Sequence, residues 1–135
     1  MNSPAIDLSS LRKALAMLSE ALAFWRGLPD GAPLKPHLRS AVIQSFEFSY
    51  ELSLRLLRRV ADGTLAELSF ADLLRAAADA GLVSDPQVWR EWRELRNATS
   101  HAYHEAKAQA IAERAAGFGA DAAALLFALE ASLAP

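Results

Sequence analysis

Apolar residues recur at steps of three and four along most of the chain, the spacing of one face of an α-helix. The first such stretch covers residues 8–26. Its apolar positions form one stripe that we expect to be buried: Leu8, Leu11, Leu15, Leu18, Leu22 and Trp25. Gly27 and the proline- and glycine-rich residues 29–33 follow, so this helix is predicted to end in a loop.

A second helix is predicted over residues 38–61, with Pro36 near its start, where proline is tolerated. Its inward stripe is expected to consist of Ile43, Phe46, Tyr50, Ser53, Leu57 and Val60. Further apolar side chains widen this surface to most of the circumference: Phe48, Leu52, Leu54 and Leu56. An apolar surface of this width favours burial on two sides, in a bundle or at a dimer contact. Asp62 and Gly63 are predicted to end the helix.

Capping patterns predict where the next two helices begin. Ser69 and Asp72 have the spacing of a capping box, and they open a short helix that ends near Gly81. Asp85 is the expected N-cap of the following helix, with Pro86 at its first position. The apolar side chains of that helix are Trp89, Trp92 and Leu95.

The last helix is predicted over the alanine-rich residues 105–133. Gly117 and Gly119 lie inside it and each costs about 1 kcal/mol relative to alanine, so they mark a kink or a tight packing point. Together these helices predict an all-α fold, an antiparallel up-and-down four-helix bundle with a short extra helix. We expect residues 1–135 to form a single domain.

Composition narrows the class of protein. The formal charge is −2 and no long basic run exists, which argues against broad nucleic-acid binding but leaves room for a local phosphate site. Cysteine is absent, which removes disulfides, thiolate nucleophiles and cysteine-ligated metals. No apolar run has the length of a membrane span, and residues 1–10 lack the apolar block of a signal peptide. These features predict a cytoplasmic protein with no membrane partner.

Candidate chemistry is concentrated in residues 96–103, where Arg96, His101 and Tyr103 lie close together. An imidazole moves protons near neutral pH, and a guanidinium stabilises charge on phosphoryl oxygens. On one straight helix Arg96 and Tyr103 would point the same way, with His101 about 140° from Arg96. The arginine side chain must therefore curl around the helix, the helix must be distorted between residues 97 and 100, or a second chain must complete the site.

Each of these residues also has a purely structural interpretation. His101 and Tyr103 could serve packing and capping, and the pair His101 and His104 lacks the further ligands of a metal site, so we expect no metal. Asn97, four residues before His101, is a candidate hydrogen-bond partner of its ring. No Gly-rich phosphate loop or serine nucleophile elbow is present.

Glu47 and Glu51 share one face of the second predicted helix. The favoured interpretation is that they are surface acids paired with Arg55 or Arg58. The alternative is that one of them orients Arg96 or His101.

Arg96, four intervening residues and then His101, Ala102 and Tyr103 resemble the Rx4HxY signature of HepT-like proteins in the HEPN superfamily. Residues 44–52 (QSFEFSYEL) and 88–101 (VWREWRELRNATSH) are similar to the second- and third-helix blocks of the branch called nucleotidyltransferase substrate-binding proteins. The resemblance covers roughly residues 8–133.

This resemblance implies a dimeric four-helix bundle and a partner nucleotidyltransferase of the MNT type. It implies the toxin of a type VII HepT/MNT toxin–antitoxin system, a metal-independent endoribonuclease without cofactors that is silenced when the partner attaches AMP to Tyr103. His101 would then be the general acid or base for RNA cleavage, and Arg96 the phosphate clamp. The alternative is a non-catalytic substrate- or nucleotide-binding subunit of a two-component nucleotidyltransferase.

Overall fold

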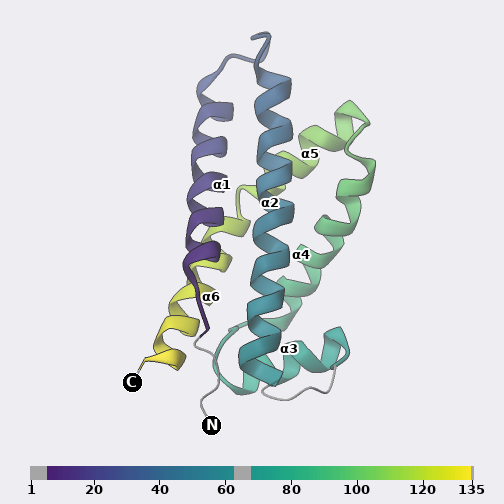
Figure 1. The fold of residues 1–135 in the computed structure, drawn as a ribbon. Helices are drawn as coiled ribbons and strands as arrows, with labels where there is room; N and C mark the ends of the chain where they lie inside the picture. The colour runs from purple at the N-terminus through teal and green to yellow at the C-terminus, as the bar shows by residue number, and fades with distance from the viewer. Residues whose placement is uncertain (1–5, 63–67, 135) are drawn as a thin grey trace.

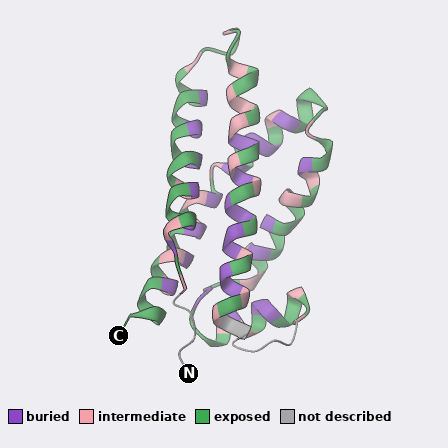
Figure 2. Ribbon diagram, viewed as in Figure 1, coloured by how far each residue is buried: buried purple, intermediate pink, exposed green. Residues whose placement is uncertain are grey.

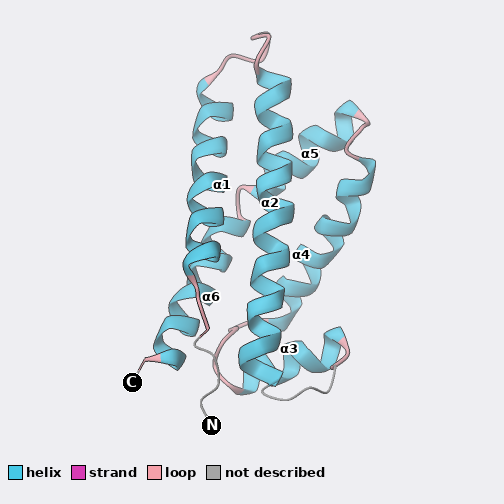
Figure 3. Cartoon of the chain, viewed as in Figure 1, coloured by secondary structure: helices cyan, strands magenta, loops and turns pink. Residues whose placement is uncertain are grey.

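The computed structural model describes residues 6–62 and 68–134, and in these ranges all regular secondary structure is helical (Figures 1 and 3). The α-helices are α1 (Ser9–Gly27), α2 (Lys35–Leu57), α3 (Phe70–Asp79), α4 (Pro86–Ala98), α5 (Glu105–Ala115) and α6 (Phe118–Leu133). Two short segments of other helix type are η1 (Arg58–Asp62), a π-helix, and η2 (Thr99–His101), a 3-10 turn. Residues 1–5, which belong to the segment without a signal-peptide block, lie outside the described ranges. Gly63, part of the predicted end of the second helix, also lies outside them.

The predicted antiparallel four-helix bundle with a short extra helix is confirmed. Helices α1, α2 and α4 alternate in direction, and α5 with α6 forms the fourth arm, while the short α3 lies at one end beside α2 and α4 (Figure 1). The start of α1 and the end of α6 lie at the same end of the bundle, where Arg12 and Glu130 form an ion pair of 3.2 Å.

Both predicted N-caps are confirmed. The hydroxyl of Ser69 accepts a hydrogen bond of 3.1 Å from the backbone N–H of Asp72 at the start of α3. A carboxylate oxygen of Asp85 accepts one of 3.0 Å from the N–H of Gln87 at the start of α4. These bonds satisfy amide donors that the helix itself leaves unpaired. Gly81 follows α3 with a φ of 78°, a left-handed conformation that glycine adopts without steric cost.

Helix α2 differs from its predicted bounds at both ends. It begins at Lys35, three residues earlier than predicted, because Pro36 in the first turn needs no hydrogen bond and has a helical φ already fixed. At the other end the helix passes into the π-helix η1, where the Arg58 Nη1 donates to the carbonyl of Leu68 at 2.9 Å. Its predicted inward stripe is buried, except that Val60 is only partly so, while Phe48 remains 58% exposed.

The prediction of one continuous helix over residues 105–133 is wrong. The segment is two helices bent by 41°, with the break next to Gly117. Gly117 therefore marks a kink; a Cβ there would lie 3.5 Å from the ring of Trp92, an ordinary van der Waals contact. Gly119 has no neighbour within 4 Å of where its Cβ would lie, so packing does not require a glycine there.

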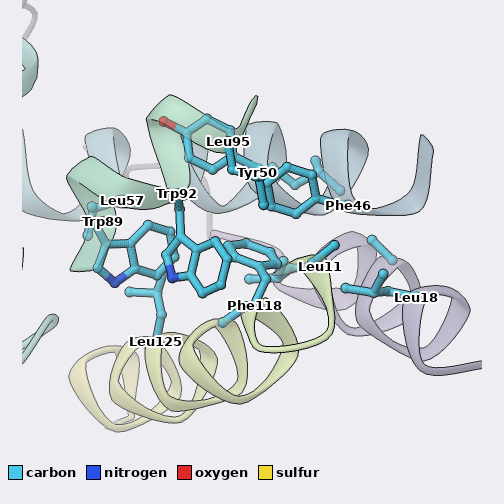
Figure 4. Packing of buried hydrophobic residues seen from close by; sticks show 14 of the residues in the cluster. Leu11, Leu18, Phe46, Tyr50, Leu57, Trp89, Trp92, Leu95, Phe118 and Leu125 are labelled. Carbon is cyan, nitrogen blue, oxygen red and sulfur yellow. The ribbon is translucent and has the colours of Figure 1, made fainter. Parts of the chain in front are cut away.

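The bend places Phe118 at the centre of the core. Its ring lies against aromatic rings from α2 and α4, with centroid distances of 5.1 Å to Phe46, 5.3 Å to Trp92 and 5.7 Å to Trp89 (Figure 4). Buried residues line the inner faces of all the long helices (Figure 2). Trp92 also donates a hydrogen bond of 2.8 Å to Asp121, which ties α4 to α6.

No single helix among the described residues is both long and apolar enough to cross a membrane. Helices α5 and α6 together meet the length and composition criteria, but they are bent by 41°.

Candidate functional site

The motif residues lie where α4 stops being an α-helix. Helix α4 ends at Ala98, and Thr99–His101 forms the 3-10 turn η2. The predicted distortion of this segment is therefore confirmed, and a straight-helix projection does not apply to it. Arg96 belongs to the last turn of α4, His101 ends η2, and Tyr103 lies in the connection before α5.

Arg96 is bound by the two glutamates of α2. Its Nη2 and Nε both contact the same carboxylate oxygen of Glu51, at 2.6 and 3.2 Å, and its Nη1 lies 3.3 Å from Glu47. The glutamates are one helical turn apart, so both face α4. The favoured prediction, in which these glutamates pair with Arg55 or Arg58, is wrong. Both contact Arg96 instead, as the alternative allowed.

Thr99 completes this network, and sequence reasoning gave it no role. Its hydroxyl accepts a hydrogen bond of 2.9 Å from Arg96 Nη1, and it lies 2.6 Å from the Arg96 carbonyl and 3.2 Å from Glu47. Thr99 is buried, so its hydroxyl must be satisfied within the protein. A hydroxyl donates one proton, so it serves the carbonyl or Glu47 at any moment. Its position three residues after Arg96 is the signal that could have found it.

The network is more negative than positive, because two carboxylates surround one guanidinium. A guanidinium has five N–H groups, and the contacts to Glu51, Glu47 and Thr99 use most of them. The Arg96 side chain is 29% exposed, against 50% for Glu51. An anion reaching Arg96 must therefore compete with Glu51, the more exposed of its two acidic partners.

His101 faces a different surface. It is exposed and lines a groove of about 270 Å³ between α4 and α5, whose other lining residues are Leu95, Ala98, Lys107, Ala110, Ile111 and Arg114. Arg96 does not line this groove. The structure therefore brings His101 together with two cations of α5 that sequence reasoning missed, whereas Arg96 is engaged with α2.

Tyr103 is the most exposed of the large apolar or aromatic side chains, at 77%. Its ring centroid lies 6.3 Å from that of His101 and 4.4 Å from that of His104. A group attached to the phenol oxygen would meet no packed protein and would lie beside His101.

Within the described ranges the Asn97 side chain has no hydrogen bond to the His101 ring, and the backbone carbonyl of Asn97 accepts one of 3.0 Å from the Ser100 hydroxyl. The described residues hold no group of three or more His, Cys, Asp or Glu side chains suited to a metal ion.

The tyrosine of α2 differs from Tyr103 in its surroundings. Burial raises the pKa of Tyr50 to about 12, although Arg93, Arg96 and Arg58 favour the phenolate. Tyr50 is therefore neutral at physiological pH and packs against Phe46 and Phe118. We assign it to the core.

The Arg96–Glu51 contact predicts a measurable coupling. In a double-mutant cycle of Glu51→Gln with Arg96→Ala, we expect a coupling free energy of about 1 kcal/mol in urea denaturation, because the pair is only partly exposed and makes two contacts. The ion pair Arg12–Glu130 is the matched control, since it has one contact of 3.2 Å and is about half exposed on both sides. Equal coupling in the two cycles would contradict the arrangement around Arg96.

Comparison with known proteins agrees with the fold and with the family that the sequence resembles. The family model described as "Nucleotidyltransferase substrate binding protein like" matches residues 6–131. A solved structure from Haemophilus influenzae, described as revealing the fold of a substrate binding domain of a nucleotidyltransferase, superposes with a TM-score of 0.81. It is 29% identical, and the match covers 92% of this chain and 99% of that one.

A curated relative from Haemophilus influenzae (strain KW20 / Rd) is named "Probable ribonuclease HepT". It is 39% identical over 80 residues, and the match spans 55% of this chain and 55% of the relative, so about half of each is aligned. The helical bundle is therefore similar to a substrate binding domain of a nucleotidyltransferase, and about half of the chain is similar to a protein named as a HepT ribonuclease. The chain belongs to the nucleotidyltransferase substrate-binding-protein-like family, which confirms the resemblance drawn from the sequence.

Proposed function

We propose that this protein is a HepT-like, metal-independent endoribonuclease that acts as a homodimer and is silenced by adenylylation of Tyr103. The observation that carries the proposal is the placement of His101 and Tyr103. Both are exposed, and their rings are 6.3 Å apart at the edge of a groove. A bulky anionic group on Tyr103 would therefore cover His101 and repel an RNA phosphate.

RNA cleavage at this site needs no group beyond those of the protein and the substrate. A base removes the proton of a ribose 2′-hydroxyl, the 2′-oxygen bonds to phosphorus, and the P–O5′ bond breaks. An acid delivers a proton to the leaving O5′, and a cyclic phosphate remains. One chain has one motif histidine, so we propose that the His101 residues of two copies share the acid and base roles across a two-fold axis.

Arg96 is proposed as the phosphate clamp of this reaction, with the Arg96 of one copy serving the phosphate beside the His101 of the other, because the two side chains of one chain face different surfaces. Its network of acids holds the guanidinium in a fixed position, with Glu47 and Thr99 as supports. For the clamp to act, an RNA phosphate takes the place of Glu51. The guanidinium then stabilises the charge that develops on the phosphoryl oxygens.

The proposed control reaction is an adenylyl transfer by a partner nucleotidyltransferase of the MNT type, in a toxin–antitoxin pair. The phenol oxygen of Tyr103 bonds to the α-phosphorus of ATP and its proton passes to solvent, while the bond to the β-phosphate breaks and pyrophosphate leaves. After co-expression with the partner, we expect an intact mass raised by the adenylyl group in the wild-type protein. We expect no increase in Tyr103→Phe, which keeps Tyr50 as the internal control for specificity.

The same samples test the nuclease activity. Wild-type protein purified without the partner should cleave single-stranded RNA, and the adenylylated form should not. Intact RNA with the unmodified wild-type protein would overturn the nuclease proposal. If the RNA stays intact and the protein binds nucleotide, the result would instead favour a non-catalytic binding subunit of a two-component nucleotidyltransferase. That second function is supported by the family's name and by the description of the superposed structure.

A further inference from the structure

We infer that Lys107 and Arg114 bind the backbone of a single-stranded RNA in the groove beside His101. The inference rests on the proposed function, because it takes RNA as the substrate. It adds the residues that hold the strand, which lie outside the Rx4HxY motif. The groove is the one lined by His101, Lys107 and Arg114, with Leu95, Ala98 and Ile111 as its apolar floor.

The two cations share one face of α5. They are seven residues apart, two helical turns, so their side chains leave the helix in the same direction within about 20° and about 10 Å apart along its axis. Both side chains are exposed. A pair of cations in a row along a groove can contact two phosphates of one extended strand.

Neither cation is neutralised by an acid in the described part of the chain. No ion pair or side-chain hydrogen bond of Lys107 or Arg114 occurs there, in contrast to Arg96, Arg12 and Arg75, which each have a carboxylate partner. Glu113 adjoins Arg114 in sequence but accepts a hydrogen bond of 3.0 Å from the Gln109 side chain instead. The groove is thus a local positive site in a chain of net charge −2.

The size and lining of the groove favour a single strand over a duplex. Its volume of about 270 Å³ lies just below the range of about 300–1,000 Å³ typical of small-molecule pockets, so it takes one nucleoside-sized group. An apolar floor contacts a base or ribose face, while cations at the rim bind phosphate. His101 at the same rim then lies beside the strand that the two cations hold.

Binding of a non-cleavable oligonucleotide tests the inference. The probe is a fluorescein-labelled 2′-O-methyl RNA of 12 nucleotides, measured by fluorescence anisotropy with the full-length protein at several salt concentrations. We expect Lys107→Ala and Arg114→Ala each to raise Kd about tenfold. Each should also lower the slope of log Kd against log salt by about 0.7, the value for one lost contact to a single-stranded phosphate. Lys107→Arg should retain both affinity and slope.

Lys13→Ala on α1 is the matched control, since its side chain is an exposed cation on another helix. Unchanged Kd and slope in both groove variants, or failure of the wild-type protein to bind the probe, would overturn the inference. Cleavage of unmodified RNA by the wild-type protein is scored separately. A chain that cleaves RNA but whose groove variants bind normally keeps the proposed function and loses the inference.

Discussion

Replacing His101 with alanine is expected to lower the rate of RNA cleavage by about 10²- to 10⁴-fold, the usual contribution of a general acid or base. In the proposed dimer the substitution removes the acid and the base together, so the upper part of this range is expected. The side chain is exposed at the end of η2, so the fold should be unaffected. The measurement is the initial rate on a labelled single-stranded RNA, together with the thermal midpoint of each variant.

His37 is the matched control for this substitution. It is an exposed histidine in the first turn of α2, outside the motif and not among the residues that line the groove, so His37→Ala should cleave RNA at the wild-type rate. His104→Ala separates the motif histidine from its neighbour, whose ring contacts Tyr103. If His101→Ala retains a rate within threefold of wild type, His101 is not the proton-transfer group and the proposed mechanism is wrong.

Local signals in the sequence were sufficient for most of the fold. The stripes of apolar residues identify the buried faces, and the caps at Ser69 and Asp85 identify the starts of α3 and α4. Such signals depend on residues within one or two turns of each other, so a single sequence carries them. The predicted start of α2 was three residues too late, because Pro36 is tolerated in the first turn of a helix and does not mark its first residue.

The break of the last arm depends on contacts that local signals do not contain. Alanine-rich residues 105–133 read as one helix, and Gly117 indicated a kink without fixing its direction or size. The bend is set by tertiary packing, in which Phe118 enters the core formed by α2 and α4 and Trp92 approaches the glycine. Tertiary contacts of this kind override helix propensity.

The candidate site shows the same division. The motif left three alternatives open, and η2 shows that one of them, a distortion between residues 97 and 100, occurs; Thr99 and Ser100 there bond to backbone carbonyls of the preceding turn. The acidic partners of Arg96 lie 45 or more residues away in sequence on α2, so spacing left their role open. Lys107 and Arg114 carry no motif and become visible only when α5 folds back beside η2.

Phe118→Ala is expected to lower the free energy of unfolding by about 3–5 kcal/mol, the usual cost of removing a fully buried phenylalanine. Phe118 has no exposed surface and contacts rings of both α2 and α4. Its loss removes edge-to-face contacts with those rings and leaves a cavity at the bend, where Gly117 offers no side chain to fill it. A domain of this size has a total stability of about 5–15 kcal/mol, so the variant should be close to unfolding.

Urea denaturation of Phe118→Ala and Phe127→Ala measures this effect, with the exposed Phe127 as the matched control on the same helix. The Phe127 side chain is 75% exposed, so truncating it should change stability by no more than about 0.5 kcal/mol. Equal destabilisation by the two substitutions would contradict the bend that directs Phe118 inward. A large difference would support the packing of Phe118 against α4, the helix whose end carries Arg96 and leads to His101.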